Sequence, residues 1–159
     1  MTDTQRYVTI AVTTCAGLSA GVFFAFSTFV MPALDRLAPS AAIEAMQQIN
    51  KAAPNGAFMT VLFAPLLGLA WLVVTVGRRG GSPAAFVITG AACFVAGLLV
   101  LMGYHVPHND ALAKVSAHAP DAHRKWRDYY TGWTAWNHVR TLAFTAATAL
   151  FALSLRTGE

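Results

Sequence analysis

Four long stretches without a charged residue most constrain how this chain can fold. They run over residues 7–34, 52–77, 84–104 and 141–155. The first three meet or exceed the roughly 20 residues that an α-helix needs to cross a bilayer core of about 30 Å. Lipid offers no hydrogen-bond partners to an open backbone, so such stretches cross as helices. The sequence therefore predicts an all-α integral membrane protein.

The fourth stretch is too short to cross the membrane alone. Its 15 residues between Arg140 and Arg156 make about 22 Å of helix. A helix that begins near Tyr130 is long enough, but it draws Asn137, His138 and Arg140 toward or below the lipid boundary. Polar groups at that depth are costly unless they face the bundle interior, and they mark a functional site. The alternative is an aromatic belt of tryptophans with Arg140 extending to the headgroups.

We therefore expect one membrane domain, residues 1–159, that folds as a four-helix bundle. The predicted spans are about 7–31, 56–77, 84–104 and 131–155. A short interfacial helix, with Ser40 as its N-cap and its end at about Ala52, follows the first span because Ile43, Met46 and Ile49 recur at helical spacing. A helical outer segment is expected between the third and fourth spans.

Prolines and glycines add detail to these spans. Pro65 lies inside the second span and predicts a kink there. Pro107 predicts a helix break after the third span, with a new helix toward Ala117. Small residues favour close helix contacts in lipid, and the candidates are Gly17, Gly21, Gly90 and Gly97.

Composition and charge exclude several functional classes. The chain is 56% hydrophobic and 11% charged, outside the range of soluble proteins. The net charge of +4 is scattered over ends and loops, so we expect the lipid bilayer, and no nucleic acid, as a partner. Cys15 and Cys93 lie within apolar runs, which argues against a disulfide framework.

Basic residues set the expected orientation. Four spans place both termini and the Arg78–Arg79 loop on one side, and the positive-inside rule makes that side cytoplasmic. The other side carries four basic residues that weaken this signal: Lys114, Arg124, Lys125 and Arg127. We expect a protein of the bacterial inner membrane.

The candidate site residues gather at two places. Trp133, Trp136, Asn137 and Arg140 recur at helical spacing, so a helix would place them on one face. At the end of the third span stand Tyr104, His108 and Asn109. Asn50, in the interfacial helix, points into the bundle or simply ends its helix before Pro54.

A metal site is the alternative chemistry. Imidazole suits iron, copper or zinc, and His105, His108 and His138 would be the ligands of a haem- or copper-binding redox protein. Against this, Pro107 interrupts the spacing that would place His105 and His108 on one face, and no acidic residue stands as a further ligand.

Four segments resemble the anthrone-oxygenase-like family of small membrane proteins. They are FSTFVMPAL, MQQIN, VPHNDAL and WTAWNHVR, spread over nearly the whole chain. The family pattern combines V-P-x-N-x-x-L with W-x-x-W-N-x-x-R, and it is matched at Val106, Pro107, Asn109, Leu112, Trp133, Trp136, Asn137 and Arg140. The resemblance implies a four-helix membrane fold and an oxidoreductase of the monooxygenase type. The histidines are outside the pattern.

On that resemblance we expect a small hydrophobic aromatic substrate and no cofactor, because a deprotonated anthrone reduces dioxygen directly. The catalytic residues would be Arg140 for the anion, Asn109 and Asn137 for carbonyl oxygens, and His108 or His138 as the base. The substrate-binding residues would be Trp133, Trp136, Asn50 and Tyr104. Besides the haem or copper protein, a non-catalytic binding or scaffold protein and a homo-oligomer are alternatives.

Overall fold

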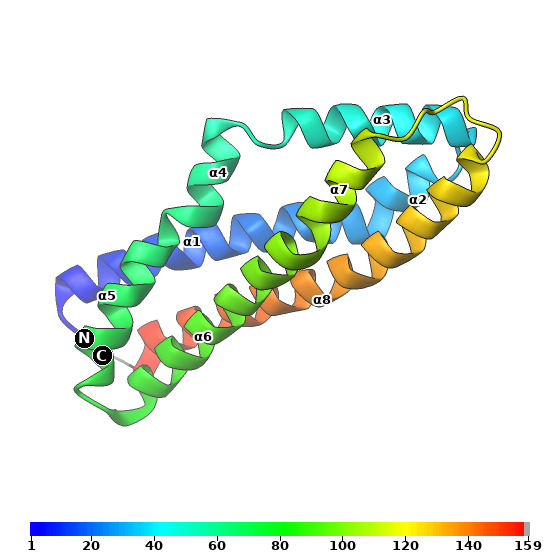
Figure 1. Cartoon of the computed structure of the whole chain (residues 1–159). Helices are drawn as coiled ribbons and strands as arrows, with labels where there is room; N and C mark the ends of the chain where they lie inside the picture. The colour runs from blue at the N-terminus through cyan, green and yellow to red at the C-terminus, as the bar shows by residue number, and fades with distance from the viewer. Residues whose placement is uncertain (158–159) are drawn as a thin grey trace.

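The computed structural model describes residues 1–157, and within them every regular element is a helix. Four helical stretches are long and apolar enough to cross a membrane: Asp3–Leu34, Gly56–Gly77, Gly81–Ala113 and Ala122–Thr157. The predicted all-α four-helix bundle is confirmed. The N-terminus and the end of the last helix lie together at one end of the bundle (Figure 1).

The elements follow in simple order along the chain. The first stretch contains α1 (Asp3–Ala25), the π-helical η1 (Phe26–Val30) and α2 (Met31–Leu34). The interfacial helix α3 (Pro39–Ala52) then leads to α4 (Gly56–Phe63) and α5 (Pro65–Gly77). The third stretch contains α6 (Gly81–Val100), η2 (Leu101–His105, π-helical) and α7 (Val106–Ala113), and α8 (Ala122–Thr157) ends the described chain.

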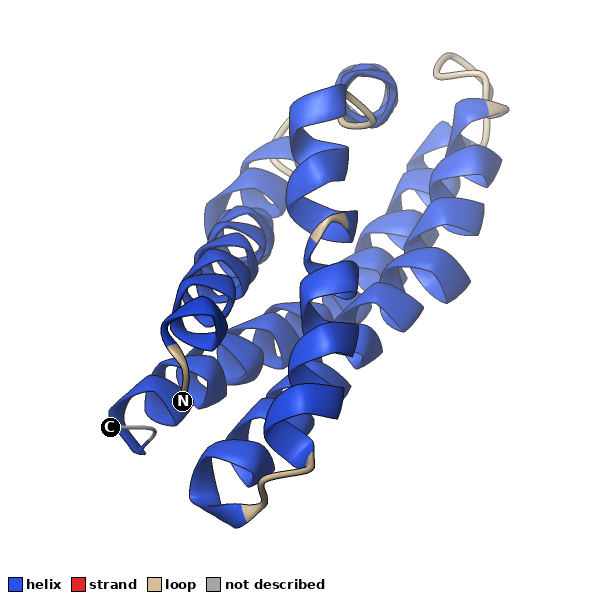
Figure 2. Ribbon diagram, turned by 90° about the vertical axis from the view of Figure 1, so that its left-hand side faces the viewer, coloured by secondary structure: helices blue, strands red, loops and turns tan. Residues whose placement is uncertain are grey.

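Helix α8 is the centre of the bundle. It packs along α1 on one side and along α6 on the other, while α5 packs against both α1 and α6. Farther along, α4 packs against α1, and α3 crosses the end of the bundle where it contacts α2, α7 and α8. Figure 2 shows from the side that the helices lie farther apart away from the termini. The half of the bundle away from the termini, where α3 and α4 lie, is therefore wider than the half that holds the termini (Figure 1).

Two prolines lie within long helices without ending them. A proline lacks an N–H and its ring clashes with the carbonyl four residues earlier, which is Thr28 for Pro32 and Gly103 for Pro107. Both carbonyls lie in the wider π-helical turns η1 and η2. The predicted break at Pro107 is therefore wrong: the helix continues through a π turn and ends at Ala113, not near Ala117.

Pro65 interrupts the second span, as its position in the sequence predicts. Helix α4 ends at Phe63 and α5 begins at Pro65, so the second span is interrupted where the proline removes a backbone hydrogen bond. Helix α3 begins at Pro39, and its N-cap is Ala38, two residues before Ser40, the predicted N-cap.

Helix α8 begins at Ala122, well before the predicted start near residue 131. Its first turns are stabilised by packing that hydropathy does not reveal, because Trp126 and Tyr129 are buried against residues of α2 and α3. Asp35, after α2, accepts hydrogen bonds from Trp126 Nε1 at 2.9 Å and from Arg127. Arg140 thus lies near the middle of a 36-residue helix.

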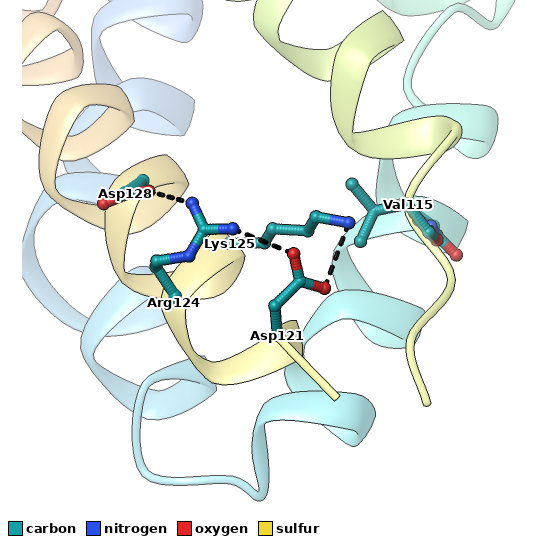
Figure 3. Close-up of polar contacts among 6 residues, drawn as sticks. Val115, Asp121, Arg124, Lys125 and Asp128 are labelled. Carbon is teal, nitrogen blue, oxygen red and sulfur yellow. Dashed lines mark hydrogen bonds and ion pairs between the residues drawn. The ribbon is translucent and has the colours of Figure 1, made fainter. Parts of the chain in front are cut away.

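Ion pairs also support the start of α8 (Figure 3). Arg124 lies 2.9 Å from Asp121 and 4.0 Å from Asp128, and Lys125 lies 3.1 Å from Asp121. The hydrogen bond from Lys125, together with the positive charges of Lys125 and Arg124, holds the pKa of Asp121 below its usual value. An ionised Asp121 before the first helical turn also favours the helix dipole.

The glycines of α6 set the distance between α6 and α8. A Cβ at Gly90 would lie 2.6 Å from Phe151, and one at Gly97 would lie 2.7 Å from Phe144. Both phenylalanines are fully buried. Gly17 faces Thr148 more loosely, at 3.6 Å, and Gly21 has no neighbour within 4 Å. The close packing predicted for the glycines therefore holds for α6, and much less for the Gly17–Gly21 pair.

The Gly97→Ala variant should be less stable than the wild type by about 1–3 kcal/mol, because the added methyl overpacks a buried ring that has no room to move. Thermal unfolding in detergent checks this. Gly21→Ala is the matched control and should not lower the midpoint, since its methyl meets open space and alanine favours the helix. Equal midpoints for both variants would contradict this account of α6 and α8.

Candidate functional site

A cavity of about 410 Å³ lies in the wider half of the bundle. Its walls come from α1, η1, α3, α4, η2, α7 and α8. Apolar side chains make most of its surface, and the polar ones are Asn50, Asn55, Asn109 and Arg140. An apolar cavity of this size with a few polar groups is typical of a small-molecule site.

The cavity has a closed inner end and an open mouth. Phe23, Met46, Trp133 and Arg140 are buried at its inner end. The exposed lining residues are Val22 on α1, Ala52 at the end of α3, and Asn55 before α4. The mouth therefore lies between α1 and the connection from α3 to α4. Because Val22 is exposed on a helix long and apolar enough to cross a membrane, we expect this mouth to open at the lipid-facing edge of the bundle.

Arg140 lies at the inner end with only 2% of its surface exposed. Its Nε donates to Asn137 Oδ1 at 3.2 Å, and its Nη2 donates to the same oxygen. Its guanidinium lies 3.7 Å from the centre of the Phe23 ring and 5.5 Å from that of Trp133. Aromatic rings attract a cation weakly, so these contacts offset part of the cost of burial.

No carboxylate pairs with Arg140 among residues 1–157, and its Nη1 donates no hydrogen bond there. A buried cation usually costs several kcal/mol when no anion compensates it. This arginine also lines the cavity. The cavity therefore presents a positive charge that a bound anion would neutralise.

Asn137 holds Arg140 in place and is itself fully occupied. Its Nδ2 donates to the Phe23 carbonyl oxygen at 2.8 Å and to Ser27 Oγ at 2.7 Å, while its Oδ1 accepts from Arg140. Ser27 also lies 3.3 Å from Thr141 Oγ1. Asn137 does not line the cavity, so in this arrangement it positions Arg140 instead of contacting a ligand.

Asn109 and Trp133 form a second polar group in the wall. Asn109 Oδ1 accepts hydrogen bonds from Tyr129 Oη at 2.8 Å and from Trp133 Nε1 at 3.0 Å. Two donors fix the orientation of the amide. The Asn109 amide nitrogen makes no hydrogen bond within the described part of the chain and belongs to a cavity-lining residue. It is available to a ligand.

Asn50 comes from α3 on another wall of the cavity. Its side chain lies beside the Tyr129 hydroxyl, yet its buried Nδ2 finds no acceptor in hydrogen-bond geometry within residues 1–157. A buried amide hydrogen without an acceptor is costly. Of the two interpretations of Asn50, the structure favours the one in which it points into the bundle.

The three histidines of the metal alternative do not converge. His105 is fully buried, with Nδ1 3.3 Å from the Val100 carbonyl oxygen and Nε2 3.3 Å from that of Trp133. His108 stacks on Tyr104, with ring centres 3.8 Å apart, and His138 is exposed. Within residues 1–157, no three His, Cys, Asp or Glu side chains group closely enough to hold a metal. None of these histidines lines the cavity.

Two other candidate residues lie outside the cavity. Trp136 is 44% exposed on the outer face of α8, so it does not share the buried face of Trp133, Asn137 and Arg140. Its ring centre lies 5.4 Å from that of Tyr104. A Cβ at Gly132 would collide with the Tyr104 hydroxyl. The structure thus separates this outer aromatic group from the predicted stacking surface, which retains only Trp133.

Sequence reasoning missed Phe23, Ser27 and Tyr129. Phe23 supplies both a ring under Arg140 and the carbonyl that Asn137 binds. The only signal for Ser27 was a polar residue in an apolar run, and serine in such runs commonly bonds its own helix backbone. The π turns determine which side of the helix Ser27 and His105 occupy, and spacing rules for a regular helix do not predict that.

A comparison with protein-family models matches residues 46–150 to the anthrone oxygenase family. The chain belongs to this family. The matched region includes Asn50, Asn109, Trp133, Asn137 and Arg140, and it leaves Phe23 and Ser27 outside. Comparisons with curated proteins and with solved structures find no match.

Replacing Asn137 should lower the stability of the protein, because the buried Arg140 would lose its hydrogen-bond acceptor. Asn137→Leu removes the only hydrogen-bond acceptor of Arg140 in the described chain, so we expect a loss of about 3 kcal/mol, the upper range for a hydrogen bond to a charged group. Thermal or denaturant unfolding in detergent measures it.

The double variant Asn137→Leu with Arg140→Leu tests whether the unpaired charge of Arg140 causes this loss of stability. Removing both partners should recover much of the lost stability, because no unpaired charge is left behind. A double variant as unstable as Asn137→Leu alone would show that the loss has another origin.

Proposed function

We propose that this protein is a membrane-embedded oxygenase that converts an active methylene group, conjugated with a ketone through aromatic rings as in an anthrone, into a second ketone. The observation that carries this proposal is the buried, unpaired Arg140 in the wall of an apolar cavity. Membership of the anthrone oxygenase family supports it.

The cavity suits the ionised form of such a substrate. Loss of a proton from the methylene gives a carbanion whose charge is shared with the ketone oxygen. Arg140 would hold that oxygen, because its Nη1 has no acceptor within residues 1–157. A preorganised donor in a water-poor site stabilises developing charge far better than water does. Trp133 would pack on the flat rings, and Asn109 and Asn50 would donate to further oxygens.

The reaction balances without a further reductant. The carbanion gives one electron to dioxygen, and the resulting carbon radical and superoxide combine into a peroxide at the same carbon. The peroxide takes up one proton and then loses water, which leaves a carbonyl. In total, one methylene group and one dioxygen give one ketone and one water.

The protein's contribution would be electrostatic. The candidate bases, His108 and His138, are outside the cavity lining, so neither is placed to take the substrate proton. The positive charge of Arg140 favours the ionised form of the substrate, and water at the mouth, where the polar Asn55 is exposed, would accept the proton. The apolar walls would limit water around the carbanion.

The test is oxygen uptake by the protein in liposomes with an anthrone as substrate. Arg140→Met should lower the rate by about 10²–10³, the loss typical of removing one oxyanion donor. Arg140→Lys should retain part of the activity because it keeps the charge.

Arg127→Met is the matched control on the same helix. Arg127 is exposed and pairs with Asp35 away from the cavity, so this variant should oxidise the substrate at the wild-type rate. An Arg140→Met variant that folds and remains fully active would rule out the assigned role.

A further inference from the structure

The polar groups of the cavity include more hydrogen-bond donors than a single anion uses. Arg140 Nη1 and Asn109 Nδ2 donate no hydrogen bond among residues 1–157. The buried Asn50 Nδ2, beside the Tyr129 hydroxyl, finds no acceptor in hydrogen-bond geometry there. They come from α8, α7 and α3, and so from different walls. A ligand that satisfies them needs oxygen acceptors at more than one edge.

We propose that this cavity is a binding site for the ring of a para-quinone. Such a ring is flat and apolar, and it carries two carbonyl acceptors at opposite edges with no proton to donate. One carbonyl would accept from Arg140 and the other from the Asn109 and Asn50 side. The ring would lie against Trp133, which Asn109 and the edge-on His105 hold in place.

The mouth of the cavity indicates a second feature of the ligand, a hydrocarbon substituent on its ring. Val22 and Ala52 are apolar and exposed at the opening, at the lipid-facing edge of the bundle. A hydrocarbon substituent on the ring therefore has a path from the cavity into the bilayer. This proposal does not depend on oxygenase activity, because a quinone binds here whether or not the protein oxidises a substrate.

Two sources share this chemistry. One is a membrane quinone with a hydrocarbon tail, and the other is a polycyclic quinone without a tail, such as the product of the proposed oxidation. A fatty carboxylate is a different class. It would engage Arg140 and pass its chain through the mouth, but it would leave the two amide nitrogens without acceptors.

The experiment is quenching of tryptophan fluorescence by 2-decyl-1,4-naphthoquinone, titrated into the full-length protein in lipid nanodiscs. Quinone dissolved in lipid quenches without saturation, whereas quinone in the cavity should give a saturable component. That component should disappear in Trp133→Phe, because Trp133 is the tryptophan that lines the cavity. 2-Decylnaphthalene has no carbonyls and should give no saturable component.

Asn50→Leu provides the decisive variant, because it removes a donor that finds no acceptor in hydrogen-bond geometry within residues 1–157. It should raise the dissociation constant about three- to tenfold, the usual effect of one hydrogen bond. Gln48→Leu is the matched control, since Gln48 lies on the exposed side of the same helix, and it should bind as the wild type does. Arg140→Lys should bind more weakly than the wild type and more tightly than Arg140→Met.

Competition distinguishes the sources. Tighter binding of the decyl quinone than of 9,10-anthraquinone supports a membrane quinone, and the reverse order supports the polycyclic product. Three outcomes would overturn the proposal: quenching that never saturates, an Asn50→Leu affinity equal to the wild type, or displacement of the quinone by an equal concentration of decanoate. Oxygen uptake measured on the same preparations tests the oxygenase separately, so either proposal can fail alone.

Discussion

A buried guanidinium without a carboxylate partner is the constraint on which the rest of this site depends. Arg140 lies in the middle of α8, and its neighbours reduce the cost of its burial by hydrogen bonds and aromatic contacts without neutralising its charge. Asn137 keeps it in place, while Ser27 and the Phe23 carbonyl keep Asn137 in place. This chain of contacts joins α1 to α8 across the bundle. The same contacts that stabilise the fold therefore leave one side of a cation facing the cavity.

The two π-helical turns connect the fold to the site. Each accommodates a proline inside a long helix, and each places one buried polar residue against α8: Ser27 from η1 and His105 from η2. Phe26 and Leu101, the first residues of these turns, line the cavity. π-helical turns are frequent at functional sites because they redirect side chains locally. In this protein the two π turns change the direction of the side chains beside the cavity, while each helix continues past its proline.

The difference between the predicted and observed site has a physical reason at each residue. Asn109, Trp133 and Arg140 lie together in the cavity wall, and Asn50 joins them from α3. Helical spacing predicted Trp136 on the same face as Trp133 and Arg140, and His138 was a candidate base, but both side chains are exposed. A spacing of three or four residues gives the face of one helix. Which part of that face meets a neighbour depends on how α1 and α6 pack on α8, and Gly90 and Gly97 allow the close approach of α6.

By itself, the sequence determined the membrane class and the four spans, because the length of a charge-free stretch is a property of the chain alone. It also indicated that polar residues of the fourth span lie toward or below the lipid boundary, where burying a charge is costly and marks a functional site. The tertiary structure decided which polar residues meet. Asn137 became a support for Arg140, the histidines were separated, and α8 gained its early start from Trp126 and Asp35. These outcomes depend on contacts between residues far apart in the sequence, where local spacing carries no information.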